Sequence, residues 1–212
     1  MPRHHVCGVV PVSVHANLGW PHWEAVKHVF CYLKGTWEHM LTIGKSGTLP
    51  WNNKEHTGLK GYCDANWALQ EHQHTMSGYI FMIDGSAVSW SSRRQSPIAL
   101  STMEAEDIVA AHAMKEALWL RTFITEITRP LTCPVTIYHD NQSAISVSKN
   151  NYFHARTKHI DIHHHFIRDA AKKGLVTILY CPMAKNLANA FAKALPGPKL
   201  DYLGSLMSLC VA

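Results

Sequence analysis

Leu59-Lys60-Gly61-Tyr62-Cys63-Asp64 is the most informative segment for the topology, because Val135-Thr136-Ile137-Tyr138-His139-Asp140 repeats its pattern. Each stretch is typical of a short β-strand that ends in an aspartate, and a long helical segment lies between them. Strands joined by a helix are usually parallel neighbours, and their C-terminal ends meet at one edge of the sheet. The sequence therefore predicts that Asp64 and Asp140 lie close together.

A glutamate from the intervening helix is expected to join these aspartates. The helix is predicted at about residues 102–127, because Ser101 and Glu104 have the spacing of a capping box. Small residues that allow a helix to pack closely against a sheet share one helical face with Glu106, namely Ala110, Ala113 and Ala117. Glu106 is therefore predicted to be the third acid, and Glu104 is the alternative.

Three converging carboxylates repel one another unless a cation lies among them. Mg²⁺ is bound through carboxylate oxygens and serves phosphate chemistry, so the pattern favours a magnesium site for a phosphate-containing substrate. The alternative is that Asp64 and Asp140 only cap turns at the ends of their strands. Turn capping would not require two parallel partners, so the metal-binding interpretation is preferred.

The remaining pattern predicts a mixed α/β domain. Asp84-Gly85 is a strong hairpin signal between two strands at residues 77–83 and 87–91. The elements expected after the long helix are the strand before Asp140, a short helix at 141–149, a helix at 160–173, a strand at 175–180 and a closing helix at 187–195. This order implies a five-stranded sheet, with three antiparallel strands and then two parallel ones, flanked by helices.

Length and composition indicate a folded chain with one main domain. The 212 residues are 47% hydrophobic and only 17% charged, which is typical of globular proteins. Residues 57–200 are expected to form the main domain, with residues 201–212 as a C-terminal tail. Residues 1–56 are expected to form an N-terminal appendage, with a helix at about residues 21–35 where apolar residues recur at helical spacing.

Charge and cysteine usage restrict the environment and the partners of the chain. A net charge of +5, with 16 histidines in addition, permits a polyanionic partner. The six cysteines form no close pairs and follow no signal peptide, so we expect reduced thiols and an intracellular location, cytoplasmic or nuclear. The apolar stretches are too short to span a bilayer, so no membrane partner is expected.

Six blocks of the sequence recur in the order and spacing of one known family. They are Gly61-Tyr62-Cys63-Asp64-Ala65-Asn66-Trp67, Ser77-Gly78-Tyr79, Val88-Ser89-Trp90-Ser91-Ser92, Ser101-Thr102-Met103-Glu104-Ala105-Glu106, Tyr138-His139-Asp140-Asn141-Gln142-Ser143-Ala144 and Arg156-Thr157-Lys158-His159-Ile160-Asp161. Together they resemble the ribonuclease H domain of copia-type LTR retrotransposon polyproteins, over about residues 57–200. Upstream, residues 22–27 and 32–36 resemble the tail of the reverse transcriptase of the same polyprotein. No Tyr-x-Asp-Asp motif is present, so no polymerase activity is expected.

The resemblance implies an endonuclease that hydrolyses the RNA strand of RNA–DNA hybrids with two Mg²⁺ ions, or with Mn²⁺. It implies that Asp64, Glu106 and Asp140 bind the metal, and that they form the catalytic set together with position 189. The implied partners are the hybrid and the reverse transcriptase of the parent element. The resemblance also places the acidic strand ends within a ribonuclease H-like fold.

The fourth catalytic position is an asparagine, Asn189, where the family has an aspartate. An asparagine brings no negative charge to a divalent ion, so we predict an attenuated nuclease and expect Asn189→Asp to raise its activity. The alternatives are a nucleic-acid-binding module that does not cut its ligand and a non-functional relic of a retroelement.

A basic stretch follows the last strong block of the family pattern. Its cationic residues are His154, Arg156, Lys158, His159, His163, His164, His165 and Arg168. The resemblance places this region near the hybrid, and the residues predicted to bind nucleic acid are Arg156, Lys158, His159 and Arg168. The alternative is a solvated helix face. His159 and His163 have a spacing that suits Zn²⁺, but no cysteine lies nearby, so structural zinc is not expected.

Overall fold

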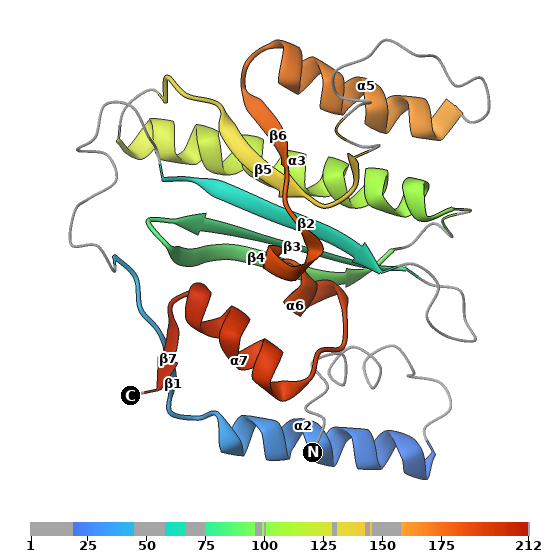
Figure 1. The fold of residues 1–212 in the computed structure, drawn as a ribbon, viewed down its shortest axis with the longest axis vertical. Coiled ribbons are helices and arrows are strands. Elements are labelled where there is room, and N and C mark those ends of the chain that lie inside the picture. Colours follow the sequence, from blue (N-terminus) through green and yellow to red (C-terminus); the bar gives the residue numbers. More distant parts are fainter. Residues whose placement is uncertain are drawn as a thin grey trace.

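The computed structural model describes residues 19–44, 58–66, 75–95, 99, 101–128, 131–142, 145 and 158–211. Its centre is a five-stranded sheet with the strand order β4-β3-β2-β5-β6 (Figure 1). The strands are β2 (Lys60–Asn66), β3 (Met76–Ile83), β4 (Ser86–Arg94), β5 (Val135–His139) and β6 (Val176–Tyr180). The neighbours β2, β5 and β6 are parallel, whereas β3 pairs antiparallel with both β2 and β4. The predicted mixed sheet is confirmed.

The hairpin between β3 and β4 turns at the predicted dipeptide. Asp84 has a φ of 49° and Gly85 a φ of 78°, so both residues adopt the left-handed conformation. Two successive left-handed residues match the right-handed twist of the flanking strands, and Asp-Gly is a preferred sequence for such a turn.

One face of the sheet is covered by α3 (Thr102–Ile127) and α5 (Lys158–Lys172), as Figure 1 shows. The bounds of α3 agree with the sequence prediction. Its start is fixed by Ser101, whose Oγ accepts the backbone N–H of Glu104 at 3.2 Å. Alanines of α3 are buried with aliphatic residues of β5, α5 and β6 in the larger hydrophobic cluster. The predicted short helix at 141–149 lies mostly outside the described residues.

The opposite face is covered by short C-terminal elements (Figure 1). They are a 3-10 turn, η3 (Met183–Lys185), and two helices, α6 (Asn189–Ala192) and α7 (Gly197–Leu206). The predicted single helix at 187–195 is wrong. Asn186 and Asn189 use their side chains to bind nearby backbone groups, which competes with helix formation, and Lys193 is already extended.

The C-terminal elements form a second hydrophobic cluster with the sheet. Ile80 and Met82 of β3 pack there with Leu200 and Leu203 of α7. The predicted domain boundary after residue 200 therefore falls inside a helix whose two halves share one core. The division into three parts otherwise stays a prediction.

Gly78 allows α6 to lie directly against β3. A Cβ atom at this position would be only 2.8 Å from the backbone nitrogen of Ala192. Any side chain here would push α6 away from the sheet, so the glycine fixes the distance between the C-terminal segment and the strands.

The N-terminal part contains the predicted helix, α2 (Trp20–Gly35), and a short strand, β1 (His39–Leu41). The strand pairs antiparallel with β7 (Leu209–Val211). The apolar residues that predicted α2 do not form a core, because Trp23, Phe30 and Leu33 are each more than half exposed. Among the described helices, none has the length and apolar character needed to cross a membrane.

Candidate active site

Asp64 and Asp140 lie side by side on neighbouring parallel strands. Tyr62 of β2 is paired in register with Tyr138 of β5, and each aspartate follows two residues later. Asp140 directly follows the end of β5, as expected, but Asp64 lies within β2, which continues to Asn66. The extra residues of β2 are paired with β3 rather than with β5, and Asp64 is fully buried.

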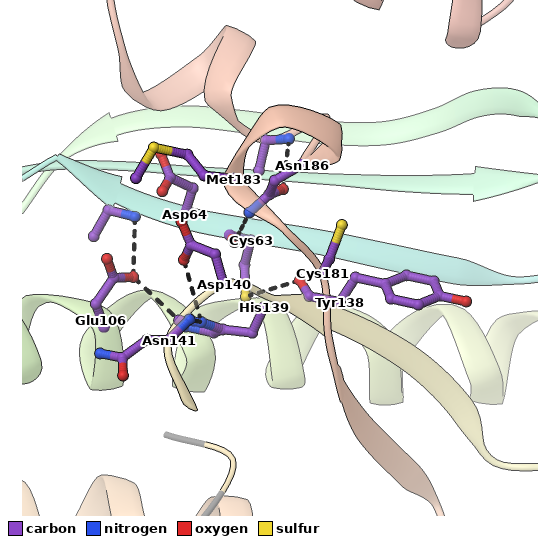
Figure 2. Close-up of polar contacts among 12 residues, drawn as sticks. Cys63, Asp64, Glu106, Tyr138, His139, Asp140, Asn141, Cys181, Met183 and Asn186 are labelled. Atoms are coloured by element: carbon purple, nitrogen blue, oxygen red, sulfur yellow. Dashed lines mark hydrogen bonds and ion pairs between the residues drawn. The ribbon is translucent and has the colours of Figure 1, made fainter. Parts of the chain in front are cut away.

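Glu106 of α3 faces the same place. Its Oε2 accepts the backbone N–H of Ala65 at 3.2 Å, which draws the carboxyl group toward β2 (Figure 2). Glu104 is also buried, but its backbone N–H is bound to the Ser101 cap at the start of the helix. Of the two candidate glutamates, Glu106 is the one that the structure brings to the aspartates. Its role as a metal ligand stays a prediction.

His139 lies among these acids and was missed by the sequence analysis. The ring is fully buried, and its Nε2 is 3.5 Å from Glu106 Oε2 (Figure 2). Burial lowers the pKa of His139, so the ring is neutral. The backbone N–H of Asn141 donates to Nδ1 at 2.9 Å, which leaves the ring proton on Nε2, facing Glu106. A usable signal was present, because strand alternation places residues 135, 137 and 139 on the buried face.

The acids shift one another's protonation. Burial, together with the charges of Asp64 and Asp140, raises the pKa of Glu106 to about 9. Burial also raises the pKa of Asp64, to about 6, although Lys193 opposes this effect. At neutral pH and without a cation, Glu106 therefore favours the neutral form, whereas Asp64 stays mostly ionised.

The donor set fits a divalent cation. Asp64 Oδ2 is buried and has no hydrogen-bond partner, which is unfavourable for a carboxylate. Ligand atoms of Glu106, His139 and Asp140 lie within 4.8 Å of one another. His139 is poorly disposed to bind a metal, because its Nε2 carries the proton. Oxygen ligands from three carboxyl groups are the chemistry that Mg²⁺ and Mn²⁺ prefer.

Asn189, the predicted fourth position, is occupied by hydrogen bonds within the C-terminal segment. Its side-chain amide donates to the carbonyl of Met183 at 2.6 Å and to the carbonyl of Asn186 at 2.8 Å. Its Oδ1 accepts from Lys193 Nζ at 3.0 Å. An aspartate could not donate to those two carbonyls, so in this conformation the segment requires the amide.

Lys193 connects this segment to the acids, and the sequence analysis missed it. Its ammonium donates to Asp64 Oδ1 at 2.9 Å as well as to Asn189. No local pattern could reveal a contact between residues 129 positions apart. Asn186 supports the same arrangement, because its side-chain amide donates to the carbonyl of Cys63 at 2.9 Å. The C-terminal segment is thereby anchored beside Asp64.

The basic stretch is only partly described. His164 is not a free surface cation, because it is buried and its Nε2 lies 2.7 Å from Asp107 Oδ2 of α3. Arg168 is half-buried on α5. Lys158 and His159 begin α5, but their side chains lie outside the described part, as does the whole of Arg156. Their predicted role in binding nucleic acid stays a prediction.

Comparison with known sequences identifies similar transposon proteins. No family model matches the chain. The chain is 37% identical, over 97% of its length, to the retrovirus-related Pol polyprotein from transposon TNT 1-94 of Nicotiana tabacum. It is 34% identical, over 82% of its length, to the retrovirus-related Pol polyprotein from transposon RE2 of Arabidopsis thaliana. The chain spans only 15% and 12% of the lengths of these two relatives.

Comparison with solved structures gives a likeness in fold. The foamy viral protease-reverse transcriptase in complex with RNA/DNA hybrid matches with a TM-score of 0.50 and 15% identity, over 76% of this chain and 22% of that one. LC11-RNase H1 in complex with RNA/DNA hybrid matches with a TM-score of 0.49 and 13% identity, over 63% of this chain and 92% of that one. At such low identity the likeness concerns the fold alone.

Proposed function

Because the chain is a homologue of the retrovirus-related Pol polyproteins of plant transposons and has the ribonuclease H fold, we propose that it hydrolyses the RNA strand of RNA–DNA hybrids. The observation that carries the proposal is that Asp64 of β2 and Asp140 at the end of β5 both lie close enough to Glu106 of α3 for their charges to act on it. The copia-type blocks of the sequence support the same reaction class.

The three carboxyl groups would hold two Mg²⁺ ions, with Mn²⁺ as a substitute. Such ions polarise phosphate oxygens and lower the pKa of bound water, which is the chemistry that phosphodiester hydrolysis requires. Glu106, whose Oε2 accepts the Ala65 N–H, and Asp64, whose Oδ2 has no hydrogen-bond partner, would be among the residues that hold the ions.

His139 lies beside Glu106, with its Nε2 3.5 Å from Oε2, and the backbone N–H of Asn141 donates to Nδ1 of the ring. The high pKa of Glu106 means that a divalent cation must displace a proton from this residue when it binds at neutral pH. Cation binding should therefore tighten as the pH rises.

The substrate would be bound chiefly through its phosphates. Arg156, Lys158, His159 and Arg168 are the proposed phosphate contacts, and such contacts are independent of sequence and weaken with salt. The reverse transcriptase of a parent element is a proposed partner, because the relatives are long polyproteins of which this chain matches a small part.

A second candidate function is hybrid binding without cleavage. It is favoured by the C-terminal segment, where the fourth acid of the family is replaced by Asn189 and the Lys193 ammonium contacts Asp64. If the enzyme is active, these two residues would make it slower than its relatives.

Cleavage of a labelled RNA–DNA hybrid by the purified chain in Mg²⁺ tests the proposal. Asp64→Asn should lower the rate by about a hundredfold or more, because it removes a ligand charge from the metal site. Asp169→Asn is the matched control, since Asp169 is exposed and pairs only with Lys173 on α5. Equal rates for the parent and Asp64→Asn would overturn the catalytic assignment. Tight hybrid binding with no cleavage by any of the three proteins would support the binding module.

A further inference from the structure

Lys193 brings a positive charge into the acid cluster that the proposed reaction does not use. Its Nζ lies 2.9 Å from Asp64 Oδ1, and Asp64 is fully buried while the lysine side chain is only 22% exposed. A charge pair shielded from water in this way interacts far more strongly than one at the surface.

The position of this ammonium is built into the fold. Lys193 directly follows α6, and its Nζ is also held by Asn189 Oδ1 at 3.0 Å. Asn189 is in turn bound to the carbonyls of Met183 and Asn186. Gly78 permits α6 to lie against β3, so the lysine is delivered to Asp64 from a segment with little room to move.

We propose that Lys193 is a tethered cation that competes with divalent metal ions for Asp64. The proposal rests on the metal site of the proposed function and adds a regulator to it. A divalent ion bound to Asp64 would meet an ammonium already bonded to one oxygen of that carboxylate, and like charges at such a distance repel. The asparagine at position 189 strengthens the effect, because the second oxygen that Lys193 Nζ contacts belongs to a neutral amide rather than to a carboxylate.

This competition predicts two opposite effects of removing the charge. Without metal, Lys193→Met leaves the buried Asp64 carboxylate unpaired and should lower the melting temperature. With metal, the same variant removes the competitor and should bind the ion more tightly. A lysine that only anchored the segment would produce the first effect without the second.

The test is a titration of the metal-free protein with Mn²⁺. Binding is measured by calorimetry and by the electron paramagnetic resonance signal of the free ion. Lys193→Met should bind Mn²⁺ roughly tenfold more tightly than the parent. Lys193→Arg should bind the ion like the parent, because it keeps the charge. Lys173→Met, which removes an exposed lysine, is the matched control and should leave the affinity unchanged.

The outcomes separate this inference from the function on which it rests. Equal or weaker Mn²⁺ binding by Lys193→Met, with binding that is abolished in Asp64→Asn, would overturn the role of Lys193 and leave the metal site intact. Absence of Mn²⁺ binding in the parent and in Lys193→Met would overturn the metal site itself, and the competition with it.

Discussion

The two sides of the candidate site are held in different ways. Asp64, Glu106 and Asp140, the acid side, are positioned mainly by strand register and by one backbone N–H, and Asp64 Oδ2 is buried without a hydrogen-bond partner. Residues 183–193, the C-terminal side, are positioned by hydrogen bonds of their own polar side chains. The amide groups of Asn186 and Asn189 are thereby occupied by backbone carbonyls. Ligand binding should therefore depend on the acid side, whereas the C-terminal side should determine the stability of the site and its positive charge.

The largest expected effect tests the acid side. Glu106→Gln should reduce hybrid cleavage by about a hundredfold or more, because it removes one of the three negative charges. The same change should stabilise the metal-free protein, since it removes a buried carboxyl group crowded by Asp64 and Asp140. Glu104→Gln is the control, with cleavage expected near that of the parent. A greater loss in Glu104→Gln would show that the other glutamate is the ligand.

A second effect concerns the pH dependence of the metal-free protein. The pKa is raised to about 9 for Glu106 and to about 6 for Asp64, so folding favours their neutral forms. This stabilisation is complete below the ordinary carboxyl pKa of about 4 and is lost as the pH rises through the two raised values. The free energy of unfolding should therefore fall by several kcal/mol between about pH 4 and pH 9, because each unit of raised pKa is worth about 1.4 kcal/mol.

Urea denaturation in the presence of a chelator measures this change. In Glu106→Gln only Asp64 of these two residues still titrates. The free energy of unfolding of this variant should therefore change less with pH at the upper end of the range. A free energy of unfolding that rises with pH, in the parent but not in Glu106→Gln, would contradict the crowding of the acids.

A negative charge added to the C-terminal side should destabilise the protein, whereas a negative charge removed from the acid side should stabilise it. Asn189→Asp should lower the free energy of unfolding by about 1–3 kcal/mol, because it removes two donated hydrogen bonds and faces two carbonyls with a carboxylate. The expectation from sequence, that this change restores a catalytic acid and raises cleavage, assumed a side chain free to turn toward the metal. Chemical denaturation and a cleavage assay on the same variant distinguish the two expectations. Lower stability without higher cleavage would support the structure-based one, and higher cleavage at unchanged stability would favour the sequence-based one.

The smallest effect concerns the contact between β4 and the C-terminal side. Ser92 Oγ donates to the carbonyl of Phe191 at 2.6 Å, and the contact is exposed. Ser92→Ala should therefore cost only about 0.5–1 kcal/mol and leave cleavage nearly unchanged. Ser205→Ala, which removes a local bond within α7, is the matched control. A large loss of cleavage in Ser92→Ala alone would mean that the two sides are more tightly coupled than their contacts indicate.

Local signals account for the parts of the fold that were predicted from the sequence. The bounds of α3 follow from the Ser101 cap and the helical spacing, and the hairpin follows from Asp84-Gly85. The proximity of Asp64 and Asp140 follows from the rule that two strands joined by a helix are parallel neighbours and end at the same edge of the sheet. These features depend on residues that are close in sequence or on a topology with few alternatives.

The features that were missed depend on contacts between distant residues. Lys193 reaches Asp64 across the sheet, and the helix expected at 187–195 is interrupted because Asn186 and Asn189 bind backbone groups instead. The apolar spacing of α2 correctly indicated a helix, but the apolar residues that share its face are largely exposed. Periodicity reports which residues share a side, and it does not report whether anything covers that side.

The antiparallel pair of β1 and β7 has a consequence for the order of folding. Met40 is opposite Cys210, so this small sheet closes a loop that contains the whole five-stranded sheet. Closing so long a loop is entropically costly unless the intervening chain is already compact. During synthesis β1 also leaves the ribosome long before its partner exists. The pair should therefore form last, and β1 must wait unpaired while the central sheet assembles.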